Sequence, residues 1–404
     1  MKVIEKKNLL PFCLVTSLFL LWGIANNMTD TLLSAFKKIM SMSDTQTSLI
    51  QFAFYGSYFC FALPAALYIR KYSYKAGVIL GLALYACGAF LFLPAAKAAS
   101  YGFYLIAIYI LAGGCSILET TANPYIMSMG SPETATRRLN IAQAFNPLGS
   151  ITGILLSHFF ILKDISLYSV SGTYAALGVV LVFILAAMLF AKMPEGKDAS
   201  SGSVGATFRR LVHNPRYIWG VVAQFFYVGA QIGVWSFTIR IVMQELGILE
   251  AQGATIYLFT IIGFSASRFI YTWLMKYIEP ARLLVFSGIA STICAVAVAC
   301  LAGSGWVLVL FLGLISFFMS LMFPTIYGIA LGGISEGPNP EDTKIGASGL
   351  IMAILGGALI TPLQAMVSDH SSIYISYLVP AICFIVVFAY ALYVVRHPNE
   401  AIEG

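Results

Sequence analysis

The chain has 404 residues, of which 59% are hydrophobic and only 10% are charged, and its mean hydropathy is +0.87. Soluble domains carry about 25% charged residues, so most of this chain does not face water. This composition excludes a cytosolic enzyme, a nucleic-acid-binding module and a disordered protein. The net charge of +6 comes from basic residues in short breaks between long apolar runs, which favours a lipid bilayer as the partner.

Twelve apolar runs are long enough to cross a bilayer, whose hydrocarbon core of about 30 Å requires roughly 20 helical residues. The runs are too long and too uniformly apolar for the alternating pattern of a membrane β-barrel. The sequence therefore predicts an all-α, polytopic membrane protein with twelve transmembrane helices. The predicted spans are residues 9–36, 46–69, 76–96, 101–130, 137–161, 168–191, 216–244, 251–275, 283–302, 305–333, 344–369 and 373–395.

The basic residues predict the orientation of these spans. With both termini in the cytoplasm, 17 of the 23 Lys and Arg residues fall in the inner segments, which is the bias typical of cytoplasmic loops. An even number of spans agrees with this arrangement. The first apolar run is too long for a cleavable signal peptide, and no small-residue cleavage site follows it.

The longest polar stretch, residues 194–215, predicts a cytoplasmic linker between two halves. The predicted domains are an N-terminal six-helix bundle, residues 1–193, and a C-terminal six-helix bundle, residues 216–404. A weak repeat between the halves supports this division, because Asn123-Pro124 in span four has a counterpart in Phe323-Pro324 in span ten. Parallel halves are typical of alternating-access transporters, which bind their substrate between the halves at mid-membrane.

Two carboxylates are predicted to lie inside the membrane, Asp30 in span one and Glu119 in span four. An ionised carboxylate at this depth costs at least a few kcal/mol, and no basic residue in the same span neutralises either one. A carboxyl group that must lose its charge to occupy a dry site is suited to carrying a proton. We therefore predict a proton-coupling role for both residues, in preference to helix capping.

Amide and aromatic side chains recur at helical spacing near these carboxylates. Amides offer paired donors and acceptors and aromatic rings offer flat apolar faces, which together suit a polyhydroxyl ligand such as a sugar. The alternative for any single amide is a hydrogen bond between helices. The predicted binding residues are Asn26, Asn27, Gln51, Tyr55, Glu119, Asn123, Gln143, Asn146, Gln224, Tyr227, Gln231 and Trp235.

Two other features of the spans bear on movement. In span five, Asn140, Gln143 and Asn146 step by three residues and are followed by Pro147, which we expect to disturb the helix. In span eight, Arg268 lies about two helical turns from the predicted cytoplasmic end. We expect its side chain either to extend to the membrane surface or to form a gating hydrogen bond.

No motif indicates a metal, a cofactor or catalysis. The seven cysteines lie in or at the ends of apolar runs and form no CxxC pair, which favours small buried side chains over a metal site or disulfide framework. A phosphate-binding Gly-Lys-Thr loop and the HExxH and GxSxG motifs are absent from the sequence. We therefore expect no cofactor, no nucleic-acid partner and no enzymatic activity.

The segments FLLWGIANNMTDTLL (19–33), ILETTANPYI (117–126) and LNIAQAFNPLG (139–149) resemble the fucose–galactose–glucose:proton symporter family of the major facilitator superfamily. The resemblance continues along nearly the whole chain, through FPTIYGIAL (323–331) and GGALITPLQAMVSD (356–369). It implies the major facilitator fold of two six-helix bundles, in the inner membrane of a bacterium.

The resemblance also implies proton-coupled uptake of a monosaccharide, with L-fucose as the expected sugar and galactose, glucose or N-acetylglucosamine as alternatives. The family's two cavity carboxylates correspond to Asp30, to which we assign proton coupling, and Glu119, to which we assign protonation linked to sugar binding. Gln143 and Asn146 match polar positions of the same cavity. We expect a monomer, and a passive uniporter, a sugar sensor and an antiporter remain as alternative functions.

Overall fold

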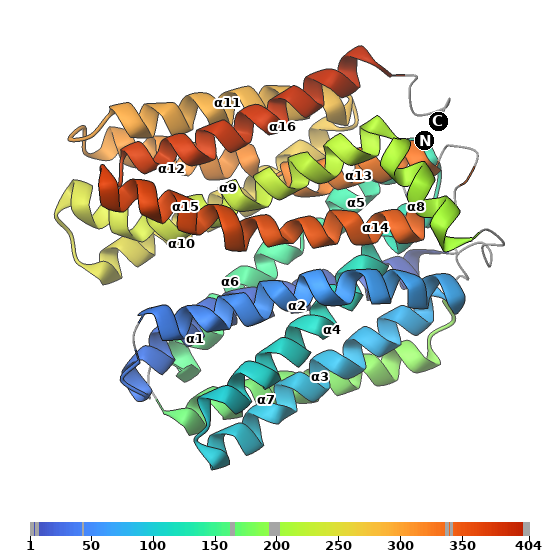
Figure 1. The fold of residues 1–404 in the computed structure, drawn as a ribbon, viewed down its shortest axis with the longest axis horizontal. Helices are drawn as coiled ribbons and strands as arrows, with labels where there is room; N and C mark the ends of the chain where they lie inside the picture. The colour runs from blue at the N-terminus through green and yellow to red at the C-terminus, as the bar shows by residue number, and fades with distance from the viewer. Residues whose placement is uncertain are drawn as a thin grey trace. The chain divides into compact units, whose positions relative to one another are not determined.

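The computed structural model describes residues 4, 8–42, 44–161, 166–193, 203–335, 339 and 342–398. Within these ranges the secondary structure is helical, with no strand (Figure 1). Twelve of its helical segments are long and apolar enough to cross a membrane. The prediction of an all-α protein with twelve membrane spans is therefore confirmed.

The first six spans are built from seven α-helices and a short π-helix, and the last six follow a short amphipathic helix. The first group comprises α1 (Leu9–Ile39), α2 (Asp44–Lys71), α3 (Tyr74–Ala98), α4 (Tyr101–Ser128), α5 (Ala135–Gln143), α6 (Asn146–Leu156), η3 (Ser157–Ile161) and α7 (Leu167–Phe190). The second comprises α8 (Val204–His213), α9 (Pro215–Leu246), α10 (Glu250–Leu274), α11 (Pro280–Cys300), α12 (Trp306–Met319), α13 (Met322–Ser335), α14 (Thr343–Met352), α15 (Gly356–His370) and α16 (Leu378–Arg396).

Polar side chains cap the starts of two of these helices, and a glycine ends one of them. The Ser73 side chain accepts a hydrogen bond from the backbone N–H of Ala76 (3.1 Å) at the start of α3. At the start of α9, Asn214 accepts one from the N–H of Tyr217 (3.0 Å), and Pro215 occupies the first turn. The helix α9 ends at Gly247, whose φ of +62° is a left-handed conformation that glycine adopts without strain.

Three predicted spans consist of two helices each. Residues 144–145 separate α5 from α6, residues 320–321 separate α12 from α13, and a 3-10 turn at Ala353–Leu355 separates α14 from α15. Pro147 lies in the first turn of α6, which agrees with the expected disturbance of span five. The other two breaks are not predicted by the sequence analysis.

The chain packs as two compact units, each built from three segments. Unit 1 comprises Met1–Ser131, Leu148–Ser203 and Glu341–Met352, and unit 2 comprises Pro132–Pro147, Val204–Pro340 and Ala353–Gly404. Unit 1 therefore includes α14 from the second half of the sequence, and unit 2 includes α5 from the first half. The predicted domain boundaries at residues 193 and 216 stay a prediction.

In unit 1, α3 and α4 pack at close range because glycine lies where they meet. A Cβ atom at Gly88 would overlap the backbone of Leu111, and one at Gly114 would overlap the backbone of Tyr85. The Tyr85 hydroxyl donates to the carbonyl of Leu21 (2.9 Å), which joins α3 to α1. These contacts make α4 the central helix of unit 1, with most of its length buried.

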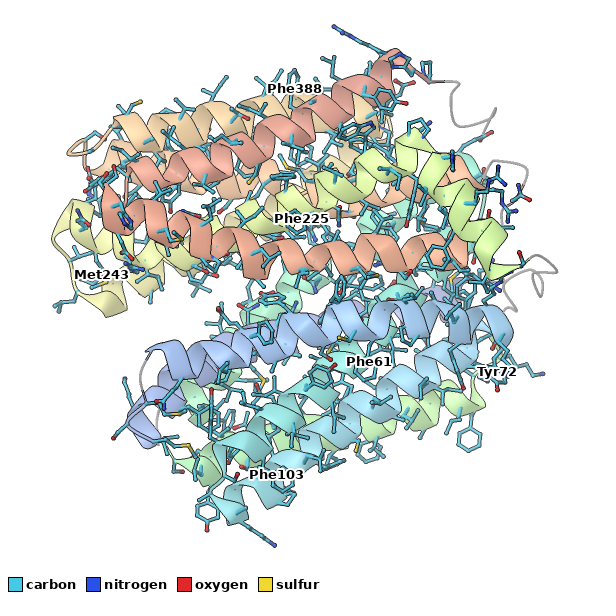
Figure 2. All side chains as sticks on the ribbon, viewed as in Figure 1. Phe61, Tyr72, Phe103, Phe225, Met243 and Phe388 are labelled. Atoms are coloured by element: carbon cyan, nitrogen blue, oxygen red, sulfur yellow. The ribbon has the colours of Figure 1, made fainter. Side chains whose placement is uncertain are left out.

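In unit 2, α9 is the central helix and packs against α15 and α16. Gly356 lies directly against the carbonyl of Phe225, which Figure 2 labels. At the other end of α9, Glu245 accepts hydrogen bonds from the backbone N–H groups of Gly303 (3.1 Å) and Gly305. Burial and the neighbouring Glu245 raise the pKa of Tyr374 to about 12, so the Tyr374 phenol remains a hydrogen-bond donor at neutral pH.

Candidate functional site

The carboxyl group of Glu119 lies in the interior of unit 1. Glu119 is on the central helix α4, and only 6% of its surface is exposed. The Tyr58 hydroxyl from α2 and the Cys115 thiol one turn earlier on α4 interact with it electrostatically. Tyr58 is itself only 1% exposed.

This environment suits reversible proton binding. In the described ranges no Lys or Arg forms an ion pair with Glu119, and a buried carboxylate without a counter-ion is costly. Binding a proton removes that cost, and the nearby phenol of Tyr58 offers a hydrogen bond when the proton leaves. This environment agrees with the predicted proton-coupling role of Glu119, which stays a prediction.

The second predicted carboxylate, Asp30, lies in the helical part of α1, but its side chain is outside the described residues. Its predicted role in proton coupling stays a prediction. On the same helix, Asn26 is half-buried and its Oδ1 atom has no hydrogen-bond partner in the described part of the chain. Asn27 donates to the carbonyl of Gly23 (3.4 Å), and its Cβ atom lies next to Gly153 of α6.

The remaining predicted residues of unit 1 lie on α2 and α4. Asn123 is fully buried one turn beyond Glu119, and Gln51 and Tyr55 on α2 are half-buried. The helices α1, α2 and α4 pack against one another. Unit 1 thus gathers these side chains on three adjacent helices, with Glu119 on the central one.

Gln143 and Asn146 lie on either side of the break in span five, at the end of α5 and the start of α6. Gln143 is 3% exposed and Asn146 is half-buried. The Gln143 carbonyl accepts a hydrogen bond from Nη1 of Arg268 (3.0 Å), and the Arg268 Nε–H donates to the carbonyl of Ser320 (2.7 Å). Arg268 is 3% exposed, so of its two expected roles the structure shows an internal hydrogen bond and not extension to the surface.

The four predicted residues of α9 differ in their burial and in their hydrogen bonds. Gln224 and Tyr227 are fully buried, and neither the Gln224 amide nor the Tyr227 hydroxyl has a hydrogen-bond partner among the described residues. Gln231 is half-buried. The Trp235 Nε1–H donates to Ser316 (3.4 Å), so this residue takes part in packing between helices, which is the alternative considered above.

Gln364 is a candidate that the sequence analysis did not single out. It lies on α15 against Gly233, is fully buried, and has no hydrogen-bond partner for either amide atom within the described residues. An unpaired buried amide costs about 1–3 kcal/mol, so such atoms are suited to water or a polar ligand. Gln364 is the lone amide in the apolar run 356–369, and that isolation was the available signal.

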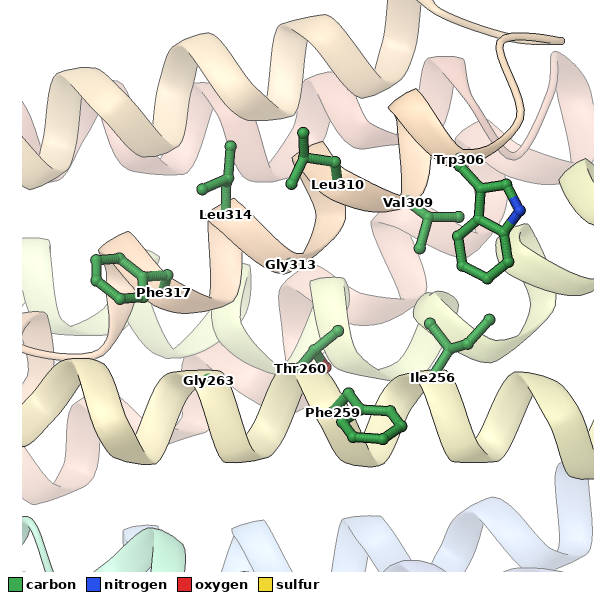
Figure 3. Close-up of a pocket in the computed structure, with 10 residues that line it drawn as sticks. All are labelled: Ile256, Phe259, Thr260, Gly263, Trp306, Val309, Leu310, Gly313, Leu314 and Phe317. Carbon is green, nitrogen blue, oxygen red and sulfur yellow. The ribbon is translucent and has the colours of Figure 1, made fainter.

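Two cavities of unit 2 lie elsewhere. The first, of about 630 Å³, lies between α10 and α12, and Figure 3 shows apolar side chains such as Phe259, Trp306 and Leu310 around it. These three side chains are more than half exposed, as expected for a surface that faces lipid. The second, of about 870 Å³, contains Arg240 and Asp369. Neither cavity is lined by a predicted binding residue.

Comparison with known proteins places the chain in a family. The model of the Major Facilitator Superfamily matches residues 12–339. An L-fucose-proton symporter of Haemophilus influenzae is 42% identical, with 96% of this chain and 97% of that protein covered. An L-fucose-proton symporter of Escherichia coli is 36% identical, covering 96% and 93%. A glucose/galactose transporter of Brucella abortus is 33% identical, covering 94% and 92%.

Solved structures agree. The crystal structure of the transporter FucP in the outward conformation has a TM-score of 0.87 and 34% identity, covering 96% of this chain and 99% of that one. A proton:xylose symporter, XylE, has a TM-score of 0.77 at 11% identity, which shows the fold alone, over 95% of this chain and 94% of that one. The chain therefore belongs to the Major Facilitator Superfamily, in the same family as the L-fucose-proton symporters.

Proposed function

We propose that this protein takes up L-fucose together with a proton across the inner membrane of a bacterium. The observation that supports this most strongly is the Glu119 carboxyl, which is buried beside Tyr58 and has no counter-ion among the described residues. A relative with 42% identity is named an L-fucose-proton symporter, which supports the choice of sugar and of coupling ion. The bias of basic residues supports an orientation with both termini in the cytoplasm, and we propose a monomer.

Transport in this proposal follows from the removal of charge. A proton from outside binds to the pair of carboxyl groups of Asp30 and Glu119 and removes one of their two negative charges, and the site then binds the sugar. Closing a site away from water costs less when it carries less charge, so the loaded carrier reorients readily. Water that enters from the cytoplasm then stabilises the ionised carboxylates, and proton and sugar leave.

The unpaired amides are the proposed sugar contacts. Each amide of Gln224 and Gln364 offers two donors and an acceptor, and a sugar hydroxyl can serve as partner to either. Asn26 offers an acceptor in the same way. A polyhydroxyl ligand thus recovers part of the cost of burying these groups, whereas an apolar ligand does not. Further sugar contacts are proposed within each unit: Gln51, Tyr55 and Asn123 in unit 1, and Gln143, Asn146 and Gln231 in unit 2.

A competition experiment tests the choice of sugar. When radiolabelled L-fucose is present well above its KM, we expect a tenfold excess of unlabelled L-fucose to suppress its uptake into proteoliposomes by about tenfold, because both compete for a saturated site. The same excess of galactose, glucose or N-acetylglucosamine should suppress it much less, because a misplaced hydroxyl leaves buried amides unpaired. Stronger competition by galactose or glucose would correct the substrate to that of the Brucella relative. Uptake that ignores the proton gradient would favour a passive uniporter.

A further inference from the structure

Arg268 binds the ends of two interrupted helices at once. Its Nη1 donates to the carbonyl of Gln143, the last residue of α5, and its Nε–H donates to the carbonyl of Ser320, which follows the last residue of α12. The last carbonyls of a helix lack partners inside the helix and carry a partial negative charge. A guanidinium group therefore stabilises both ends by hydrogen bonding and by charge, without any carboxylate.

The position of α5 gives this contact its importance. Although α5 begins span five, it packs within unit 2, where Asn140 Nδ2 donates to the Thr325 hydroxyl of α13 (3.3 Å). Further along the same two helices, Thr136 lies against Gly328. After the break at residues 144–145, the rest of span five packs in unit 1, where Gly149 of α6 lies against α1.

Arg268 thus bonds to the chain just before it passes from unit 2 to unit 1. The guanidinium also lies 4.7 Å from the centre of the Phe264 ring, which shields it from water on that side. In the described part of the chain no carboxylate pairs with Arg268, so its two carbonyl bonds are the polar contacts that hold it. If the Gln143 carbonyl moved away before water entered, the buried guanidinium would keep only one of these two hydrogen bonds.

We propose that the hydrogen bonds of Arg268 hold α5 against the other helices of unit 2 while the cytoplasmic side is closed. Opening to the cytoplasm then requires the Gln143 carbonyl of α5 to separate from Arg268. We call this contact the latch. The cytoplasmic location rests on the orientation given in the proposed function. Water that enters as α5 moves away takes the place of the Gln143 carbonyl as the hydrogen-bond acceptor of Arg268. The Arg268–Gln143 hydrogen bond is therefore stable while water is excluded and breaks when water enters. The fork of a guanidinium reaches two carbonyls at fixed geometry, which a lysine ammonium does not reproduce.

A cysteine on α5, at the point where α5 contacts α13, reports the separation of these two helices. Thr136→Cys puts a thiol against Gly328, where α13 partly shields it, so a membrane-impermeant maleimide added at the cytoplasmic face reacts with it faster after α5 separates from α13. In inside-out vesicles without sugar, we expect Arg268→Gln to raise the labelling rate about tenfold, as expected for loss of one charge-assisted hydrogen bond. Arg268→Lys should give an intermediate rate. The chain with only its native cysteines provides the blank.

Two further variants keep the test decisive. Arg240→Gln removes an exposed arginine that stacks on Phe237 at the other end of unit 2, and it should leave the labelling rate unchanged. Thr325→Val removes only the neutral bond to Asn140, so it should raise labelling in the same direction but less than Arg268→Gln. Arg268→Lys, which keeps the charge but not the fork of the guanidinium, decides the matter if Arg268→Gln fails to fold, as judged by gel filtration.

Unchanged labelling in folded Arg268→Gln, or in Arg268→Lys where the former does not fold, would overturn the latch. Because labelling is measured without sugar, this result does not depend on which sugar the protein carries. Faster labelling together with absent L-fucose uptake by the native chain would retain the latch and reject the proposed substrate.

Discussion

At the scale of single residues, the proposed chemistry centres on the buried carboxyl group of Glu119 on α4. Among the described residues, the groups that interact with it, Tyr58 and Cys115, carry no positive charge. In the proposed function, a proton and not a fixed ion pair balances the charge of this carboxyl group. The same reasoning predicts that uptake falls as the external pH rises, because fewer protons are available to load the site.

Replacing either carboxylate with its amide should separate binding from coupling. We expect Asp30→Asn to retain exchange of L-fucose across the membrane but to lose uphill accumulation, at least tenfold, because the amide cannot release a proton. Glu119→Gln should retain sugar binding and lose its dependence on pH. The measurements are counterflow and gradient-driven uptake of radiolabelled L-fucose in proteoliposomes.

A surface carboxylate provides the matched control for these variants. Glu279 is 69% exposed and pairs with Arg282 at 2.9 Å, so Glu279→Gln should leave accumulation unchanged. If Asp30→Asn accumulated sugar as the native protein does, Asp30 would have no part in coupling.

At the scale of helices, close packing depends on glycine at particular crossings. Gly88 and Gly114 let α3 and α4 approach until backbone touches backbone. Gly356 does the same between α15 and α9. A side chain at such a point cannot move aside, because the atom that it meets belongs to the main chain.

Gly114→Val should therefore destabilise unit 1. The added atoms would overlap the Tyr85 backbone, and overpacking of this kind costs about 1–3 kcal/mol or more. The expected result is a lower midpoint of thermal unfolding in detergent and less monodisperse protein. Gly172→Val on α7 is the control, since a Cβ atom there meets nothing within 4 Å. Equal stability of the two variants would contradict the packing described for α3 and α4.

The helices differ in how far the sequence predicts them. All twelve spans follow from hydropathy, because burial in lipid requires only a sufficiently long apolar run. The breaks at 144–145 and 320–321 both come just before a proline, Pro147 and Pro324, although only the first is predicted above, and the 3-10 turn at 353–355 has no such local signal. Gln364 was missed because its burial and unpaired amide come from its contact with α9.

At the scale of the whole molecule, two units share the chain in an interleaved way. The predicted halves divide at the polar stretch 194–215, whereas α5 packs within unit 2 and α14 packs within unit 1. In unit 1, the Lys344 ammonium of α14 lies 5.1 Å from the centre of the Tyr74 ring of α3. Composition and charge indicate the two halves, but the packing of α5 and α14 comes from contacts with residues far away in the sequence, which leave no local signal.

The most direct test of proton-coupled sugar uptake is the movement of protons when sugar is added. The native protein is reconstituted into proteoliposomes that contain a pH-sensitive dye, and L-fucose is added outside without a preset gradient. Proton-coupled uptake predicts immediate acidification of the lumen when L-fucose is added, and no acidification when the protein carries Asp30→Asn. Uptake of L-fucose by folded native protein without any acidification would contradict proton coupling and leave a uniporter as the remaining function.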